Sequence, residues 1–292
     1  MNVARNAADL EVRPRAVAIG TFDGMHLGHA AVVRAAVDAG RSADLVPTVV
    51  TFDPHPRTVL GNRVELLATL ERRLELLDAA GVEDVLVAEF SPELAGLDPE
   101  SFAGTYLLGV GARVVVAGTG FRFGRQRTGD LDLLRKLGLD ARQVPLVEGV
   151  SSTRIRQLTR AGEIEGAARL LGRPLEVEGT VVSGDQRGGT LGFPTANLAV
   201  RAEVLVPGFG IYAGAAGERR AAISIGVNPH YGGTERRVEA YLLDWTGDLY
   251  GERIVLELWR RLRDERAFGS EAELVDQIAR DVEETRAARR PV

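Results

Sequence analysis

The feature that most constrains the fold is a change of pattern near the middle of this 292-residue chain. Before it, short runs rich in Val, Ala and Leu alternate with segments of helical spacing. Such runs are typical of strands buried on both faces of a parallel sheet, and their alternation with helices predicts a doubly wound α/β domain. The expected strands are residues 15–22, 46–52, 84–90, 112–118 and 142–147.

Local signals place several helices between and after these strands. Residues 70–77 carry apolar side chains at spacings of three and four, and Gly81 is a suitable stop. Asp98 before Pro99 is a typical helix start. We expect a last helix over residues 153–171, ended by residues 172–174.

Beyond that helix, apolar runs follow one another with turn signals and without helices between them. This pattern predicts an antiparallel barrel or sandwich. The spacing of Ser270 and Glu273 is that of a capping box, which predicts a C-terminal helix. We therefore expect two domains, residues 1–172 and 173–292. The β runs are residues 176–184, 210–216, 219–227, 236–244 and 251–259.

Composition narrows the classes of function. Residues 1–172 carry 20 basic and 22 acidic side chains, and residues 173–292 carry 16 and 19, so neither domain has the basic excess typical of a nucleic-acid binder. There is no cysteine, which excludes disulfides and thiolate metal sites. No run is long enough to span a bilayer, and no signal peptide is evident, so we expect a cytoplasmic protein without membrane or nucleic-acid partners. The sequence leaves the oligomeric state open, a homo-oligomer included.

Two of the four histidines stand three residues apart in the turn after the first strand, within residues 18–30 (AIGTFDGMHLGHA). In a doubly wound sheet, ligands bind beyond the carboxyl ends of the strands, and free N–H groups at a helix start attract phosphate. His26 and His29 share one face of the first helical turn, where they can donate hydrogen bonds to phosphate oxygens as charge develops.

The glycines of this turn are consistent with a phosphate-binding site. Gly20 and Gly24 let the backbone bend close to a ligand, and Gly28 lets a substrate pack on the first helical turn. A zinc site would need a third ligand nearby, and none is present, while the GxGxxG dinucleotide pattern is absent. Histidines without a functional role remain an open alternative.

Residues 20–29 (GTFDGMHLGH) resemble the signature of the HxGH nucleotidyltransferases, which bind ATP at this turn and release pyrophosphate. The signature alone leaves pantetheine phosphate, nicotinate mononucleotide, glycerol phosphate and FMN open as substrates. Residues 51–56 (TFDPHP), 120–124 (GFRFG) and 151–156 (SSTRIR) are similar to further blocks of one family. That family is the bacterial bifunctional riboflavin kinase/FMN adenylyltransferases, or FAD synthetases, of the RibF type.

The resemblance implies roles for individual residues of the first domain. A helix start with hydroxyls and an arginine can gather phosphates, although residues 151–156 also fit a simple helix cap. Residues 53–56 are implied to contact flavin or phosphate, the alternative being a rigid loop. Phe121 and Phe123 could stack on an isoalloxazine ring or form strand core. The implied ATP or phosphate ligands are Gly20, Thr21, Phe22, Asp23, Gly24, Gly28, Ser151, Ser152, Thr153 and Arg156, and the flavin ligands are Asp53, His55, Phe121, Arg122 and Phe123.

The second domain carries a glycine-dense segment, residues 179–197, inside a β pattern without a P-loop. Its glycines permit N–H groups to curl around an anion, and Thr195 and Asn197 offer neutral oxygens to a magnesium ion. Residues 192–197 (GFPTAN) match the riboflavin kinase signature, and the match extends to residues 207–214, 238–245 and 249–254 and to the C-terminal helix. The resemblance implies Mg²⁺ held by Thr195 and Asn197. The residues it implies for ATP and Mg²⁺ are Gly184, Arg187, Gly188, Gly192, Pro194, Thr195 and Asn197.

The resemblance further implies a catalytic carboxylate, Glu239, which would accept the proton of the ribityl 5′-hydroxyl as it attacks the γ-phosphorus. By pattern alone Glu239 is a solvent-facing strand residue. Arg263 and Phe268 fit the flavin-binding C-terminal segment. The chain departs from the family at Gly120, where an acidic or amide residue is usual, and at His230.

The sequence thus predicts one chain with two transferases, which phosphorylates riboflavin to FMN with ATP and Mg²⁺ and adenylylates FMN to FAD, with ATP, riboflavin and FMN as its small-molecule partners. His26, His29 and Glu239 are the predicted catalytic residues. Two alternatives stay open at this point. One is an active riboflavin kinase with an impaired or repurposed nucleotidyltransferase domain, suggested by Gly120. The other is a flavin- or nucleotide-binding regulator without turnover.

Overall fold

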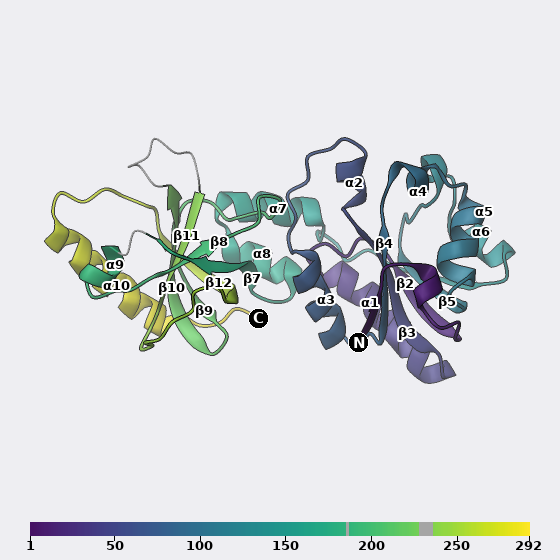
Figure 1. Ribbon diagram of the computed structural model, residues 1–292, viewed down its shortest axis with the longest axis horizontal. Coiled ribbons are helices and arrows are strands. Elements are labelled where there is room, and N and C mark those ends of the chain that lie inside the picture. The colour runs from purple at the N-terminus through teal and green to yellow at the C-terminus, as the bar shows by residue number, and fades with distance from the viewer. Residues whose placement is uncertain (185–186, 228–235) are drawn as a thin grey trace. The chain divides into compact units, whose positions relative to one another are not determined.

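A computed structural model describes residues 1–184, 187–227 and 236–292, which form two compact units, Met1–Ser151 and Ser152–Val292 (Figure 1). The chain therefore divides by contacts before the helical residues 152–171, whereas the sequence pattern places them with the first domain. In the structure the end of this helical segment packs on strands of the second unit.

The first unit is a parallel six-stranded sheet with the order β1-β4-β3-β2-β5-β6. This confirms the predicted doubly wound fold. The structure adds β1, whose three residues are too few to give a recognisable pattern. The strands are β1 (Asn2–Ala4), β2 (Arg15–Ile19), β3 (Val46–Asp53), β4 (Asp84–Glu89), β5 (Ala112–Gly118) and β6 (Asp140–Val144).

Helices cover both faces of this sheet, as Figure 1 shows. Alternate residues of β2 separate the two layers: Val17 and Ile19 join one apolar core, Ala16 and Ala18 the other. The first core is closed by Phe102, Leu107 and Leu134, and the second by α1 and α3. The helices are α1 (Leu27–Ala43), α2 (Pro56–Val59), α3 (Leu70–Ala79), α4 (Pro92–Gly96), α5 (Pro99–Ala103) and α6 (Leu131–Lys136), with short helical segments at Ala7–Asp9, Gly104–Leu108 and Arg125–Arg127.

The second unit is a closed antiparallel barrel with the strand order β10-β11-β8-β7-β12-β9. Of the two predicted alternatives, a barrel and a sandwich, the barrel is therefore correct. Strand β8 was not expected, because its short run overlaps the end of the glycine-dense segment. The strands are β7 (Leu175–Val182), β8 (Ala196–Ala199), β9 (Gly210–Ala216), β10 (Arg219–Val227), β11 (Arg236–Leu242) and β12 (Arg253–Arg263).

One helix prediction of the second unit is wrong. Residues 153–171 form two helices, α7 (Ser152–Ala161) and α8 (Ile164–Leu171), rather than one. Gly162 breaks the helix with φ +74°, and a Cβ at that position would lie 3.1 Å from the Tyr212 hydroxyl. The break thus lets the chain pass close to the barrel.

The C-terminal helix α10 (Glu271–Ala287) is confirmed, and Ser270 caps it by accepting a hydrogen bond from the Glu273 N–H at 3.3 Å. The Glu273 carboxylate accepts from the Gly269 N–H at 3.1 Å rather than from the Ser270 N–H of a full capping box. Helix α10 packs on β9 and β10, and α8 packs on β7 and β12. A further short helix, α9 (Arg187–Thr190), lies in the glycine-dense segment.

Candidate functional site

The turn between β2 and α1 holds the two histidines against each other. Their rings stack with centroids 3.6 Å apart and an angle of 14° between planes. His26 is the N-cap of α1, and its Nδ1 accepts a hydrogen bond from the His29 N–H at 3.2 Å. Phe22 packs edge-on against His29 at 5.5 Å. The structure thus brings both histidines to the start of the helix, as the spacing predicts.

The backbone of this turn adopts positive φ angles, which residues other than glycine rarely adopt. Phe22 and Met25 have φ of +50° and +40°, and Gly24 has φ +80°. A Cβ on Gly24 would lie 2.8 Å from the Leu67 side chain, and one on Gly28 would lie 3.2 Å from the His26 ring. Strained residues of this kind gather at sites where the surrounding structure holds the chain for a function.

Buried polar contacts hold the turn from behind. The Asp23 carboxylate is buried and accepts hydrogen bonds from the N–H groups of Leu67 at 2.9 Å and Ala68 at 3.3 Å. The carbonyl oxygen of Thr21 accepts a hydrogen bond from the Thr51 hydroxyl at 3.1 Å. These contacts fix the turn to β3 and to the segment before α3.

Arg73, which the sequence analysis did not single out, also contacts the turn. Its Nη1 donates to the Thr21 carbonyl oxygen at 2.6 Å. Burial lowers the pKa of Arg73, while the charges of Asp23 and Asp53 act in the opposite direction. The sequence does carry a signal for this residue, because Arg73 takes a core-facing position between Leu70 and Leu77 on an otherwise apolar stripe.

The predicted flavin ligands of residues 53–55 lie at the carboxyl end of β3. Asp53 forms an exposed ion pair with Arg5 at 3.4 Å. His55 is the N-cap of α2 and accepts from the Arg57 N–H at 3.2 Å. A pocket of about 600 Å³ lies beside Arg5 and is also lined by Glu89 and Tyr106. Burial raises the pKa of Tyr106.

Residues 120–123 lie outside the strands, with Gly120 in a turn and Phe123 in an isolated antiparallel bridge with Gly129, so the period-two aromatics do not follow from a strand pattern. Phe123 is buried and packs on Phe102 at 5.4 Å, and Phe121 is half-buried and stacks on Phe123 at 5.6 Å. The Arg122 guanidinium pairs with Asp130 at 2.8 Å. Gly120 has φ +78°, and a Cβ there would meet no atom within 4 Å.

The serine-rich predicted phosphate ligands lie where the two units divide. Ser151 ends the first unit, and Ser152 begins α7 in the second. Thr153 lies on the first turn of α7 and is exposed, whereas Arg156 on the same helix is buried. Their predicted role in binding phosphate stays a prediction.

Two predicted kinase residues, Glu239 and Asn197, share the outer face of the barrel. Glu239 on β11 lies opposite Asn197 on β8 and opposite Ser224 on β10, and residues directly opposite one another in a sheet share a face. The neighbouring Val238 and Ala240 are buried in the barrel, so the Glu239 row faces outward. Arg237 lies 3.9 Å from the Glu239 carboxylate.

The glycines of the second site are packed against its polar residues. A Cβ on Gly184 would lie 2.2 Å from the Asn197 side-chain nitrogen. A Cβ on Gly188 would lie 2.3 Å from the Phe193 carbonyl oxygen and 3.4 Å from the Thr195 hydroxyl. Gly192 has φ +86°. Arg187 begins α9.

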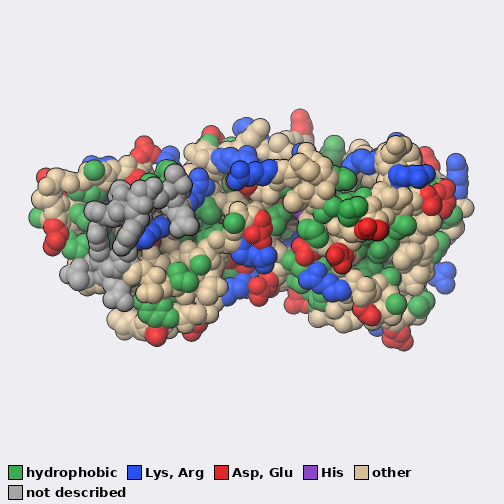
Figure 2. All heavy atoms as spheres, turned by 45° about the horizontal axis from the view of Figure 1, so that its top comes forward, with side chains coloured by type: hydrophobic (Ala, Val, Ile, Leu, Met, Phe, Trp, Pro, Cys, Tyr) green, Lys and Arg blue, Asp and Glu red, His purple; other side chains and the backbone are tan. Residues whose placement is uncertain are grey.

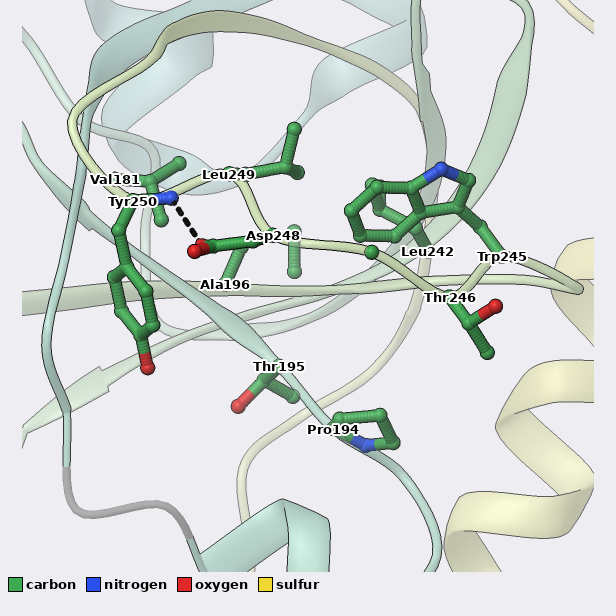
Figure 3. A pocket seen from close by; sticks show the side chains of 12 residues that line it. Val181, Pro194, Thr195, Ala196, Leu242, Trp245, Thr246, Asp248, Leu249 and Tyr250 are labelled. Atoms are coloured by element: carbon green, nitrogen blue, oxygen red, sulfur yellow. Dashed lines mark hydrogen bonds between the residues drawn. The ribbon is translucent and has the colours of Figure 1, made fainter.

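A pocket of about 320 Å³ opens beside these residues (Figure 3). Trp245 and Tyr250 lie at its opposite ends, and Pro194 and Thr195 lie along the wall between them. The Tyr250 N–H donates to the Asp248 carboxylate at 2.8 Å, which shapes the loop that carries both residues. The sequence analysis gave Trp245 and Tyr250 no role, although both lie in runs, residues 238–245 and 249–254, that match the riboflavin kinase pattern.

The predicted flavin ligands near the C-terminus also lie together. The Arg263 guanidinium is 5.7 Å from the centre of the Phe268 ring and pairs with Asp281 of α10 at 2.7 Å. Arg266 lies over the same ring at 4.9 Å. His230, the second departure from the family pattern, lies outside the described residues.

Acidic and basic side chains are interspersed on the described part of the face in Figure 2. Among the described residues, no group of three or more His, Asp or Glu side chains could hold a metal ion by itself. No helix in residues 1–184, 187–227 and 236–292 has the length and apolar character needed to cross a membrane.

In comparison with known proteins, the two folded units match two different family models. The family model of FAD synthetase matches residues 9–156, and that of riboflavin kinase matches residues 171–289. The bifunctional riboflavin kinase/FMN adenylyltransferase of Listeria monocytogenes is 35% identical over 94% of this chain and 92% of its own length. The protein of the same name from Escherichia coli K12 is 34% identical over 96% of both chains.

A solved structure from Streptococcus pneumoniae, described as a macrolide-efflux protein, has the same fold. It aligns with a TM-score of 0.87 and 34% identity over 97% of this chain and 98% of its own. Both halves of the chain thus have relatives in a single protein, in the same order.

Proposed function

Because the chain belongs to the family of bifunctional riboflavin kinase/FMN adenylyltransferases, we propose how its residues carry the two reactions of that family. The protein phosphorylates riboflavin with ATP to give FMN, and it transfers AMP from ATP to FMN to give FAD and pyrophosphate. The observation that carries this function is the match of both family models, one to each fold, along a chain that aligns with bifunctional relatives over nearly its whole length. No observation favours the alternative of an impaired first domain.

For adenylyl transfer, we propose that the turn before α1 binds the phosphates of ATP. An oxygen of the FMN phosphate attacks the α-phosphorus, the bond to the β-phosphate oxygen breaks, and pyrophosphate leaves. No covalent enzyme intermediate is needed, so the protein acts by alignment and by stabilising charge. The stacked rings of His26 and His29 at the helix start are placed to donate hydrogen bonds to the phosphate oxygens.

The backbone of the same turn completes this proposed nucleotide site. Because Gly20, Gly24 and Gly28 carry no side chain, a phosphate can approach the backbone of the turn closely. Thr21 and Asp23 act through the shape of the turn, which their buried hydrogen bonds support. The other proposed nucleotide ligands of this reaction, taken from the sequence resemblance, are Phe22, Ser151, Ser152, Thr153 and Arg156.

The flavin of this reaction is proposed to bind at the carboxyl edge of β3 and β4. The pocket beside Arg5 and Tyr106 supports this place, because its volume is in the range of small-molecule sites. Phe121 is the aromatic residue with an accessible face, and the buried Phe123 supports it from behind. Asp53, His55 and Arg122 are proposed polar contacts.

For the kinase reaction, we propose that Glu239 accepts the proton of the ribityl 5′-hydroxyl while that oxygen attacks the γ-phosphorus and ADP leaves. Its carboxylate faces the same side of the barrel as Asn197. Gly184, Arg187, Gly188 and Gly192 belong to the segment that we propose wraps the phosphates. The pocket between Trp245 and Tyr250 is the proposed place of the adenine ring, since Pro194 and Thr195 form its wall.

We propose Mg²⁺ as the metal ion of the kinase reaction. The donor set fits, because Thr195 and Asn197 carry neutral oxygens next to a carboxylate, and magnesium binds through few protein oxygens together with phosphates and water. When bound, the ion offsets the charge of the transferred phosphate. Thr195 and Asn197 orient it, and the approach of Gly184 to the Asn197 side chain holds that amide in place.

Arg263 and Phe268 are proposed to bind riboflavin, supported by their mutual contact and by the anchoring of Arg263 on Asp281. We also propose a cytoplasmic enzyme whose partners are its small-molecule substrates, which cell fractionation would test.

The function is tested with two variants of the whole chain. We expect His29→Ala to abolish FAD formation from FMN and ATP while riboflavin is still converted to FMN. Glu239→Ala should abolish FMN formation from riboflavin while supplied FMN is still converted to FAD. Products are separated by chromatography, and pyrophosphate is assayed. Loss of both activities from either change, in a folded protein, would contradict two separate sites.

A further inference from the structure

Arg73 is a buried cation directly behind the turn that carries the two histidines. Arg73 is only 6% exposed. Its Nη1 donates a hydrogen bond to the Thr21 carbonyl oxygen at 2.6 Å and lies 3.4 Å from the Thr51 hydroxyl. The neighbouring Arg72 is a contrast, because it is more exposed and pairs with Glu75 at 2.6 Å. Adjacent arginines on one helix thus have different surroundings.

The hydrogen bond to Thr21 sets the direction of the next amide group. In a planar trans peptide the C=O of one residue and the N–H of the next point in opposite directions. The Thr21 carbonyl is held by both Arg73 and Thr51, so the Phe22 N–H points away from them. Within the described part of the chain, that N–H donates no hydrogen bond.

The position of Arg73 is not explained by an ion pair. Among the described residues, no carboxylate lies within 4.0 Å of its guanidinium, and its Nε is buried without a hydrogen-bond partner. Burying a cation in this way is costly, and a leucine or methionine would continue the apolar stripe of α3 without that cost. The charges of Asp23, in the turn, and of Asp53, at the end of β3, raise the pKa of Arg73 against the lowering effect of burial.

We propose that Arg73 is a positioning residue for adenylyl transfer: it holds the Thr21 carbonyl inward, so that the Phe22 N–H is presented to the phosphates of ATP, and it keeps positive charge beneath the turn. This inference rests on the adenylyltransferase function proposed above. Arg73 acts through the peptide group and does not touch the reacting atoms.

The experiment compares Arg73→Met, Arg73→Lys and the matched control Arg72→Met in the full chain. FAD formation from FMN and ATP is measured as kcat and KM, well below the unfolding temperature of each variant. We expect Arg73→Met to lower kcat by about 100-fold, the scale of a misplacement of about 1 Å in the site. Arg73→Lys, which keeps the charge, should recover part of that loss. Arg72→Met should behave as the unchanged protein, and riboflavin kinase activity should be unaffected in all three.

A purely structural role predicts a different result: a lower unfolding temperature with kcat and KM within about twofold of the unchanged protein. That outcome for Arg73→Met would overturn the inference, as would a loss of kinase activity of the same size. If Arg73→Met does not fold, Thr51→Val removes the other donor to Thr21, and an unchanged kcat in that variant overturns the inference instead. If the unchanged protein makes no FAD, the proposed function fails, and this result is distinguishable from the others.

Discussion

The imidazole of His26 accepts the backbone N–H of His29 at 3.2 Å while the two rings stack 3.6 Å apart. One histidine therefore caps the helix on which the other stands. The cap and the proposed phosphate site are built from the same residue, so its structural and catalytic contributions need to be separated by experiment.

Replacing His26 separates these contributions. His26→Ala removes the cap and should lower the free energy of unfolding by about 0.5–2 kcal/mol, whereas His26→Asn keeps a capping oxygen and should retain stability. Both variants should lose most adenylyl transfer, because neither supplies the imidazole. Urea unfolding and the rate of FAD formation are the measurements. An active His26→Asn variant would show that capping is the whole role.

Replacing Gly24 tests whether the turn depends on its close packing. Gly24→Ala places a Cβ at positive φ and 2.8 Å from Leu67. The matched control is Gly61→Ala, at φ +83° with no atom within 4 Å of the new Cβ. We expect Gly24→Ala to be less stable than the control by about 1–3 kcal/mol, the range for overpacking, and to form FAD more slowly. Equal unfolding free energies in the two variants would contradict the packing argument.

The departure at Gly120 is open to direct test. Its φ of +78° is a conformation that asparagine adopts more readily than alanine, and the space around its Cβ position is empty. We expect Gly120→Asn to fold with stability equal to or above that of Gly120→Ala and to lower the KM of adenylyl transfer by restoring a side-chain amide. Steady-state kinetics with FMN and ATP measure this, and a raised KM in a folded Gly120→Asn protein would oppose it.

The contact of Gly184 with Asn197 predicts a selective loss. A methyl group on Gly184 would lie 2.2 Å from the Asn197 side chain and must displace it. Gly184→Ala should therefore lower the rate of FMN formation and leave FAD formation from supplied FMN unchanged. Gly217→Ala, in the turn between β9 and β10, whose Cβ meets nothing within 4 Å, is the control and should retain both activities. Full kinase activity in Gly184→Ala would contradict a role for the Asn197 amide.

Asp98 gives a pH dependence of known sign. The backbone N–H of Ser101 donates to its carboxylate at 2.8 Å and holds the pKa of Asp98 below its ordinary value. A carboxyl with a lowered folded pKa stabilises the protein above its unfolded pKa and loses that contribution as pH falls through the folded value. The variant Asp98→Asn keeps a capping oxygen that does not titrate.

The stability difference between the unchanged protein and Asp98→Asn should therefore shrink on acidification. Urea midpoints of both proteins, measured from pH 5 to pH 2, roughly the range of carboxyl titration, follow this difference. A difference that stays constant over that range would show that the Asp98 carboxylate adds nothing beyond its capping oxygen.

The sequence by itself determined the doubly wound fold of the first domain and the place of the histidine turn, and it left a barrel or a sandwich open for the second domain. Buried apolar runs separated by helical segments admit few arrangements, and the turn after the first strand must lie at the carboxyl edge of the sheet. The helix caps at Asp98 and Ser270 could also be predicted from the sequence, because each cap joins residues only three positions apart.

Only the tertiary structure decided which polar groups lie behind the turn and which residues lie beside Glu239 on the outer face of the barrel. The sequence places Arg73 on the apolar stripe of α3, but its contacts with Thr21 and Thr51 arise only when α3 packs near β3 and the turn. The break at Gly162 and the pairing of Glu239 with Asn197 likewise depend on contacts between residues far apart in the chain. Local propensities cannot encode such contacts, because they form only when packing brings distant segments together.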